Sequence, residues 1–433
     1  MARKMKDSGI EWIGEIPEGW EITKIKHIVS SVTDIDHFMP DSAEFGIPYL
    51  MIGDLKDLSS SIDWDSSKKI SIEDYKKLSI KSRPQIGDII FARYASIGTT
   101  CYIDTDRDFL VSYACLTIHP SDLIIGKLLS YYLKSSSFAE DVLRRTNSNT
   151  QGNVGKDSLV NATIVLPSII EQTQIVNFLD AKCSDINAML SKTRASIEEY
   201  KKLKQTVITQ AVTKGVRGER EMKDSGVEWI GEIPAEWSKC HLKNISSEIG
   251  DGLHGTPNFD DNGDVFFING NNLGGEYVEP RADTKRINSE EFLKYTRPFF
   301  SNQTIMISLN GSYGKVSLYK NFPMLLGKSA GYITLLPSID CRYIKYYLSS
   351  TPSQIMMTLS LNGTTIPNLS LNTLRNFSIF LPVLCEQKEI ANYLDAKCTE
   401  IDGLIAKKEQ LVKELESYKK SLIYEVVTGK REV

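Results

Sequence analysis

The chain has 433 residues, of which 41% are hydrophobic and 24% are charged, and its formal net charge at pH 7 is −4. This length exceeds what one hydrophobic core usually serves, so two or three domains are expected, and the slightly acidic balance argues against a protein that coats nucleic acid without specificity. Seven cysteines without a Cys-x-x-Cys pair argue against a disulfide framework and a zinc site. No signal-peptide pattern opens the chain and no apolar run reaches about 18 residues, so we expect a cytoplasmic protein that does not contact a membrane.

A short opening segment occurs twice in the chain. Residues 5–20 read MKDSGIEWIGEIPEGW, and residues 222–237 read MKDSGVEWIGEIPAEW. The two copies contain four of the five tryptophans. Rings that stack on nucleic-acid bases should differ between two reading sites, whereas these copies are nearly identical. We therefore predict that the tryptophans pack against helix ends.

Each opening segment is followed by an insert, insert one at residues 22–165 and insert two at residues 239–380. The two inserts show little sequence identity. Insert one contains 16 Lys and Arg against 18 Asp and Glu, and insert two contains 13 against 11. Because this difference is small, binding of nucleic acid must depend on local loops rather than on overall charge.

Insert one contains two stretches that could read bases. FARYASIGTT at 91–100 predicts a strand, a turn and a strand, with Gly98 at positive φ in the turn and Arg93 and Tyr94 beside it. RRTNSNTQGNVGK at 144–156 is a dense polar loop, and Asn, Gln, Arg and Lys present the donors and acceptors that base readout requires. The candidate residues of this loop are Arg144, Arg145, Asn147, Asn149, Thr150, Gln151 and Lys156. The alternative is an ordinary solvent-exposed loop.

A long helix is predicted after each insert. LPSIIEQTQIVNFLDAKCSDINAML at 166–190 matches LPVLCEQKEIANYLDAKCTEIDGLI at 381–405. The start signals are Pro167 and Pro382, and the stop signals are Gly215 and Gly429.

Apolar residues recur at heptad spacing in both predicted helices and form a coiled-coil seam. The seam residues are Leu179, Ile186, Leu190 and Ile197 in the first helix and Leu394, Ile401, Ile405 and Val412 in the second. Each helix could instead pack on the core of its own domain. We favour an antiparallel pair, because pairing buries two equal apolar stripes together and gives the chain an approximate two-fold repeat. Cys183 and Cys398 fall on the seam, so we expect them to be small buried hydrophobic residues rather than redox groups.

Insert two offers four candidate stretches. GDGLHGTPNF at 250–259 and INGNNLGG at 268–275 are polar and glycine-spaced, and SLNGSYGKV at 308–316 predicts a second strand–turn–strand element with Gly314 at the bend. SLNGTTIPN at 360–368 corresponds to the polar loop of insert one. The candidate residues are His254, Thr256, Asn269, Asn271, Asn310, Ser312, Tyr313, Lys315, Asn362, Thr364 and Thr365. For His254 the alternative is a histidine satisfied within its own turn.

The ordered set of these segments, present twice, resembles the specificity subunit of Type I restriction–modification systems. The resemblance rests on SG-x-EWIGEIP, on the LP…EQ…LDAKC stretch and on helices ending AVTKG or VVTGK, and it covers the whole chain. It implies two mixed α/β (α+β) target recognition domains separated by a pair of long antiparallel coiled-coil helices, each domain reading one half of a split double-stranded DNA sequence. It also implies docking of two methyltransferase subunits and of restriction subunits with ATP-driven translocase and nuclease activity. The chain itself would have no catalytic site and no cofactor.

The resemblance and the repeat together predict six segments. Their boundaries are 1–21 for the first opening segment, 22–165 for target recognition domain 1, 166–221 for the central helical region, 222–238 for the second opening segment, 239–380 for target recognition domain 2 and 381–433 for the C-terminal helical region. Each recognition domain is therefore expected to be an exchangeable module.

A search for catalytic motifs agrees with a chain that has no active site of its own. No Asn-Pro-Pro-Tyr or Asp-Pro-Pro-Tyr loop of an adenine methyltransferase occurs, and GKS at 327–329 lacks the leading glycine of a phosphate-binding loop. Two other classes stay open: a structural adaptor whose inserts bind proteins, and an enzyme with an unrecognised site. Salt dependence of DNA binding tests the adaptor, and turnover of the isolated chain on DNA with S-adenosylmethionine tests the enzyme.

Overall fold

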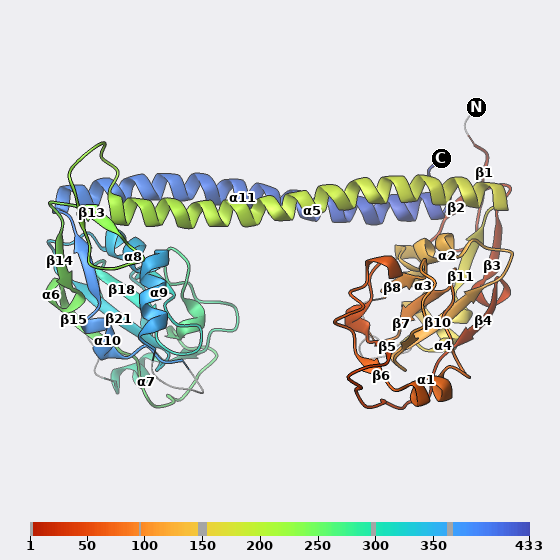
Figure 1. Cartoon of the computed structure of the whole chain (residues 1–433), viewed down its shortest axis with the longest axis horizontal. Helices are drawn as coiled ribbons and strands as arrows, with labels where there is room; N and C mark the ends of the chain where they lie inside the picture. The colour runs from red at the N-terminus through yellow and green to blue at the C-terminus, as the bar shows by residue number, and fades with distance from the viewer. Residues whose placement is uncertain (1–2, 95–96, 146–153, 296–299, 362–366) are drawn as a thin grey trace. The chain divides into compact units, whose positions relative to one another are not determined.

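The computed structural model describes residues 3–94, 97–145, 154–295, 300–361 and 367–433 (Figure 1). The chain divides into two compact units: unit 1 combines Met1–Arg194 with Gln410–Val433, and unit 2 is Ala195–Glu409. Each unit contains one opening segment, one insert and a part of both long helices. Across the described residues, no helix is long and apolar enough to cross a membrane.

The two longest helices are α5 (Ile169–Lys214) and α11 (Leu384–Val427). The glycines that follow them lie in the left-handed region, with φ of +77° at Gly215 and +72° at Gly429. Glycine adopts this conformation without the steric cost that a Cβ would bring, and it is the usual residue that ends a helix. The helices also begin two residues after Pro167 and Pro382, so the predicted start and stop signals are confirmed.

Within each unit α5 and α11 run antiparallel. The polar contacts between them are Lys419–Asn187 and Arg194–Glu416 in unit 1, and Lys204–Asp402 and Lys408–Tyr200 in unit 2. In both units the residue numbers rise along α5 as those of their partners fall along α11. The fold is thus the predicted one, two mixed α/β domains with a pair of long antiparallel helices and an internal repeat.

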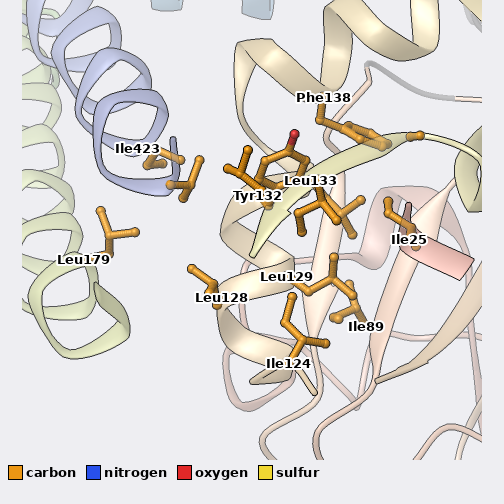
Figure 2. Packing of buried hydrophobic residues seen from close by; sticks show 14 of the residues in the cluster. Ile25, Ile89, Ile124, Leu128, Leu129, Tyr132, Leu133, Phe138, Leu179 and Ile423 are labelled. Carbon is orange, nitrogen blue, oxygen red and sulfur yellow. The ribbon is translucent and has the colours of Figure 1, made fainter. Parts of the chain in front are cut away.

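The apolar stripes of the two helices are largely buried. Leu179, Ile186, Leu190, Ile197, Leu394 and Ile401 are at most 7% exposed, and Ile405 and Val412 are half-buried. In unit 1 the stripe also faces the insert, because Leu179 of α5 and Ile423 of α11 lie opposite Leu128 and Tyr132 of α2 (Gly126–Leu133), as Figure 2 shows. Helix pairing and packing on the domain core, which were alternatives in the sequence, occur together here.

The cysteines on the stripe are buried thiols. Cys183 is 5% exposed and Cys398 is 6% exposed. Burial raises the pKa of both thiols, so little thiolate forms at neutral pH and neither side chain is a reactive nucleophile. This confirms the expectation of small hydrophobic residues.

Insert one folds around two sheets, with strand orders β4-β10-β7-β8 and β6-β5-β9. The strands are β4 (Val29–Thr33), β5 (Ile47–Leu50), β6 (Lys69–Ile70), β7 (Ile89–Ala92), β8 (Thr100–Tyr102), β9 (Leu110–Val111) and β10 (Cys115–Pro120). Besides α2, the helices are α1 (Ile72–Leu78), α3 (Ser136–Arg145), α4 (Lys156–Val160), η1 (Ile25–His27), η2 (Ile52–Asp54) and η3 (Ser59–Ser61). Ile89, Ile90 and Phe91 are fully buried, so β7 reads as an unbroken apolar run rather than an alternating pattern.

Insert two has the same topology, with strand orders β15-β21-β18-β19 and β17-β16-β20. The strands are β15 (Ser246–Asp251), β16 (Val265–Ile268), β17 (Arg286–Ile287), β18 (Thr304–Ser308), β19 (Val316–Leu318), β20 (Met324–Leu326) and β21 (Ala330–Leu335). The helices are α6 (Leu242–Ile245), α7 (Ser289–Leu293), α8 (Cys341–Ser349), α9 (Thr351–Leu359), α10 (Leu371–Arg375) and η4 (Gly270–Asn272). Two inserts with little sequence identity therefore share one fold.

The two ends of each insert lie side by side. In unit 1, β3 (Glu21–Lys24) pairs antiparallel with β11 (Thr163–Leu166), and in unit 2, β14 (Ser238–His241) pairs with β22 (Ser378–Leu381). The opening segments form hairpins of the same kind in both units. Their strands are β1 (Met5–Asp7) with β2 (Glu15–Pro17), and β12 (Met222–Asp224) with β13 (Glu232–Pro234).

The glutamine of the repeated Glu-Gln pair, at the start of each long helix, fastens the insert to that helix. Gln172 is 1% exposed, accepts a hydrogen bond from the Ile125 backbone N–H at 2.8 Å and donates to the Pro167 carbonyl at 3.0 Å. Gln387 makes the equivalent bonds in unit 2, with the Asp340 N–H at 2.9 Å and the carbonyl of residue 382 at 2.8 Å. A buried amide needs a partner for both its donor and its acceptor, and the glutamine has both partners in each copy.

The aspartate of the repeated LDAKC stretch makes a second fastening. Asp180 accepts hydrogen bonds from Lys127 Nζ at 2.6 Å and Tyr131 Oη at 2.8 Å, both on α2. On α8 of unit 2, Arg342 and Tyr346 bind Asp395 at 2.6 and 2.8 Å. Burial and the hydrogen bond to the carboxylate raise the pKa of both tyrosines, so each hydroxyl stays protonated and donates.

The tryptophans of the opening segments differ in their surroundings. Trp20 and Trp237 are 1% exposed and belong to the cores that contain the ends of α5 and α11, which confirms for these two the predicted packing against helices. Trp20 Nε1 donates to Glu171 at 3.2 Å, whereas the buried Nε1 of Trp237 has no hydrogen-bond partner among the described residues. Trp229 is 40% exposed, and for that ring the packing stays a prediction.

Candidate nucleic-acid interface

The turn between β7 and β8 is built as predicted around Gly98, whose φ is +91°. The Arg93 side chain is 14% exposed, pairs with Asp34 at 3.3 Å and lies 5.7 Å over the ring of Tyr94. Tyr94 is 45% exposed. The turn therefore presents an aromatic ring to solvent, with the arginine held behind it.

The described part of the polar loop in insert one begins and ends with charged residues. Arg144 pairs with Glu140 at 2.9 Å, and Arg145 pairs with the buried Asp141 at 2.7 Å, so both guanidinium groups have partners at the end of α3. Lys156 is exposed at the start of α4. Four predicted residues lie outside the described residues: Asn147, Asn149, Thr150 and Gln151.

The turn and the polar loop of insert one are neighbours. The backbone N–H of Val154 donates to the carbonyl of Arg93 at 3.0 Å. The same arrangement occurs in insert two, where the N–H of Leu369 donates to the carbonyl of Leu309 at 2.9 Å and Asn310 forms a bridge with Asn368. In both units, stretches that were proposed separately from the sequence meet at one edge of the four-stranded sheet, which we call the main sheet (β4-β10-β7-β8 in unit 1 and β15-β21-β18-β19 in unit 2).

The turn between β18 and β19 holds the next candidates. Gly314 has φ +74°, as predicted for the bend. Ser312 is exposed, and its carbonyl accepts from Ser308 Oγ at 2.6 Å. Tyr313 and Lys315 are half-buried, and the Tyr313 hydroxyl lies 3.2 Å from Thr358 Oγ1. The predicted residues Asn362, Thr364 and Thr365 lie outside the part of the chain that is described.

The remaining candidates of insert two divide into exposed and internally bonded residues. His254 is 63% exposed and its Nε2 lies 2.7 Å from Asp251 Oδ2, while Thr256 and Asn271 are exposed. Asn269 is half-buried and accepts from Ser329 Oγ at 3.2 Å, so its side chain supports the loop.

Segments 327–329 and 112–114 contact the turns at the two edges, and the sequence predictions of DNA contact did not include them. In unit 2 the backbone N–H of Leu309 donates to the Ser329 carbonyl, and the N–H of Gly270 donates to Ser329 Oγ at 3.0 Å. In unit 1 the N–H of Arg93 donates to the Ala114 carbonyl in the same way. The signal available in the sequence is only that both segments stand directly before a buried strand.

The edge offers hydrogen-bonding and aromatic groups rather than catalytic ones. Exposed Asn, Ser, Thr, His and Tyr side chains gather there from separate turns, which suits readout of base edges and of the phosphate backbone. No group of three His, Cys, Asp or Glu side chains that could hold a metal ion occurs among the residues that the structure describes.

The chain matches known proteins along nearly its whole length. It matches the family described as the Type I restriction modification DNA specificity domain twice, over residues 17–199 and 234–414. It is 27% identical to a protein of Methanocaldococcus jannaschii named as a type I restriction enzyme MjaX specificity subunit, over 96% of this chain and 95% of that one. The MjaVIII specificity subunit of the same organism is 26% identical, over 96% and 93%.

Two solved structures share the fold. One, from work on complex assembly and conformational transition of the type I R-M system, gives a TM-score of 0.72 at 17% identity and covers 96% of this chain and 99% of that chain. The HsdS subunit from Thermoanaerobacter tengcongensis gives 0.50 at 18% identity, covering 96% and 98%. At these identities the likeness concerns the fold alone.

Proposed function

The chain belongs to the Type I restriction modification DNA specificity family, and on that premise we propose that each of its two inserts reads one half of a split double-stranded DNA target. The observation that carries the proposal is that one edge of the main sheet is built twice, on the same topology, with different side chains. A shared scaffold with divergent loops is what two different half-sites require, because bases are read by side chains while the scaffold sets their position.

The candidate DNA-contacting residues lie at these two edges and on the stretches of the predicted loops that fall outside the described residues. Asn and Gln suit adenine, Arg and Lys suit guanine, and Tyr94 offers a face for contact with a base or sugar. The residues proposed for insert one are Arg93, Tyr94, Arg144, Arg145, Asn147, Asn149, Thr150, Gln151 and Lys156. Those for insert two are His254, Thr256, Asn269, Asn271, Asn310, Ser312, Tyr313, Lys315, Asn362, Thr364 and Thr365.

The long helices and opening segments would dock two methyltransferase subunits. Leu203 of α5 is 46% exposed, and the matching position of α11, Tyr418, is 48% exposed. Large apolar side chains repeated on the surface at matching positions favour two copies of one partner. Restriction subunits would join this core. The S-adenosylmethionine, the ATP and all catalysis would belong to these partners, so the chain is proposed to be a non-catalytic subunit.

Mapping methylated adenines in cells tests the proposed function. Cells that carry this chain with its methyltransferase subunit should gain methylation at a single bipartite sequence, and cells that lack the chain should lose it. Methylation at one unsplit sequence, or methylation that persists without the chain, would contradict the proposal.

Salt titration of binding separates DNA readout from the structural-adaptor alternative. The affinity of the assembled complex for a duplex that carries the mapped target should fall steeply as salt rises, because phosphate contacts release counterions. A complex whose affinity for DNA is negligible at low salt would favour the adaptor.

A further inference from the structure

The shared topology allows residues of the two inserts to be matched without sequence identity. Thr117 of β10 pairs with Thr33 of β4 and with Ile90 of β7. In insert two, Tyr332 occupies the corresponding place, since it pairs with Gly250 of β15 and with a residue of β18. Thr33 and Gly250 are therefore equivalent, and the residues that follow them can be compared by counting along the sequence.

Counting on from this register gives two histidines the same place in the sequence of their inserts. Asp34 corresponds to Asp251, and His37, three residues further, corresponds to His254. The spacing from the opening segments agrees, because each histidine lies 17 residues after the second tryptophan of its unit (37 from 20, and 254 from 237). The sequence predictions included His254 and omitted His37, although the shared Asp-x-x-His spacing was present.

Both histidines are exposed at the same edge as the candidate readers. The ring of His37 stacks on Tyr113 with centroids 4.9 Å apart, and Asp34, three residues before it, forms an ion pair with Arg93. His254 lies against its own aspartate, as described above. Each imidazole is thus oriented by a neighbour, a ring in unit 1 and a carboxylate in unit 2, and neither is buried in a core.

A residue that is the same in two domains with different DNA targets is suited to contact the part of the DNA that the two targets share. The half-sites differ in bases but share the phosphodiester backbone, which is contacted in register-setting interactions. Other positions at the edge differ between the inserts: Arg93 corresponds to Leu309, Tyr94 to Asn310, and Met51 to Asn269.

From this pattern we infer that His37 and His254 are equivalent phosphate-contacting residues, which set the position of each recognition domain on DNA while the divergent neighbours read bases. The inference rests on the proposed function. It assigns a role to His37, which the sequence predictions omitted. For both rings the proposed partner is a phosphate oxygen that accepts a hydrogen bond from a ring N–H.

The test uses the complete chain assembled with its methyltransferase subunit and two DNA duplexes, one with the mapped target and one with both halves scrambled. His37→Ala and His254→Ala should each weaken binding of both duplexes by about fivefold to tenfold, because a hydrogen bond to a charged group is lost. The ratio of the two affinities and the mapped methylated sequence should not change. His37→Asn, which keeps an N–H donor, should recover part of the loss.

His27→Ala is the matched control, because His27 is exposed on η1, where its ring nitrogen lies 3.2 Å from Thr23 Oγ1, outside the proposed edge. Unchanged affinity in His37→Ala, or a changed half-site in the methylation map, would overturn the inference while leaving the proposed function intact. A wild-type complex that binds both duplexes equally would instead overturn the proposed function.

Discussion

The two inserts reach one topology with different residues, whereas the framework that holds them keeps its residues. Strand β7 is built on Ile90 and Phe91 and strand β18 on Met306 and Ile307, and all four side chains are fully buried. A buried strand in a core needs apolar volume, which many residues supply. A hydrogen bond needs a particular atom, and the buried glutamine and the half-buried aspartate that fasten each insert are identical in both units.

Among the changes that test this difference between inserts and framework, exchanging a whole insert should have the largest effect. Replacement of residues 22–165 by the insert of another family member should change one half of the methylated sequence completely and leave the other half as it was, because the ends of the insert meet at β3 and β11 and the framework is untouched. Mapping methylated adenines measures this. A change in both halves would show that the inserts do not read independently.

The next largest effect should come from shortening a buried leucine of the apolar stripe of α5 or α11. Leu179→Ala and Leu394→Ala, at matching positions with 0% exposure, should each lower the free energy of unfolding by about 2–5 kcal/mol. Hydrogen exchange should show the loss of protection mainly in unit 1 for Leu179→Ala and in unit 2 for Leu394→Ala. Leu203→Ala, on an exposed position, is the control and should change stability little. Equal loss in both units would mean that the units are not separate cores.

Neutralising Glu171 should have a smaller, pH-dependent effect. Burial raises the pKa of this carboxyl, but hydrogen bonds from Ser168 and Trp20 and the charge of Arg3 outweigh it, so the pKa is lowered. Its stabilisation is therefore complete above the ordinary glutamate pKa of about 4.3 and is lost as the pH falls through the lowered value. Glu171→Gln should cost about 1.5 kcal/mol at pH 7.

Thermal unfolding of Glu171→Gln and of the wild-type protein, compared from pH 7 down to acid, checks the sign. The difference in Tm should shrink as the pH falls below about 4. A difference that stays constant would mean that the charge of Glu171 contributes nothing.

The smallest expected effect is a difference in stability between variants of the two buried tryptophans, Trp20 and Trp237. Trp20→Phe removes volume and the hydrogen bond to Glu171, whereas Trp237→Phe removes similar volume and a donor without a described partner. Trp20→Phe should therefore be more destabilising by about 1 kcal/mol, measured by urea unfolding. Equal losses would place the stabilising role of Trp20 in packing alone.

Local patterns predicted the parts of the fold that repeat. The helices, their glycine ends, the antiparallel pairing and the turns at Gly98 and Gly314 followed from heptad spacing, prolines and glycines. The sheets of the inserts did not, because strands such as β6 and β9 have only two residues each and pair with strands far away in sequence. Such short runs carry no recognisable period.

The residue types of the candidate site could be predicted from the sequence, but the contacts between its residues could not. Polar, glycine-spaced stretches marked the turns, and the structure brings them to one edge. The partner of Arg93, Asp34, lies 59 residues before it in the chain, so its ion pair has no local signature. Tyr113 and Ser329 were missed because a polar residue beside a buried strand resembles many others. Whether the proposed side chains contact bases stays a prediction.

The division of the chain between the units has a consequence for its synthesis. Unit 2 is one continuous stretch, but unit 1 includes Leu422, Ile423 and Val426, which are buried against insert one. A ribosome that adds about 5–20 residues per second needs on the order of 10–40 s to make unit 2 before these side chains emerge. The recognition domain that is translated first is therefore completed last, and a nascent chain released before residue 410 lacks the groups that close its first core.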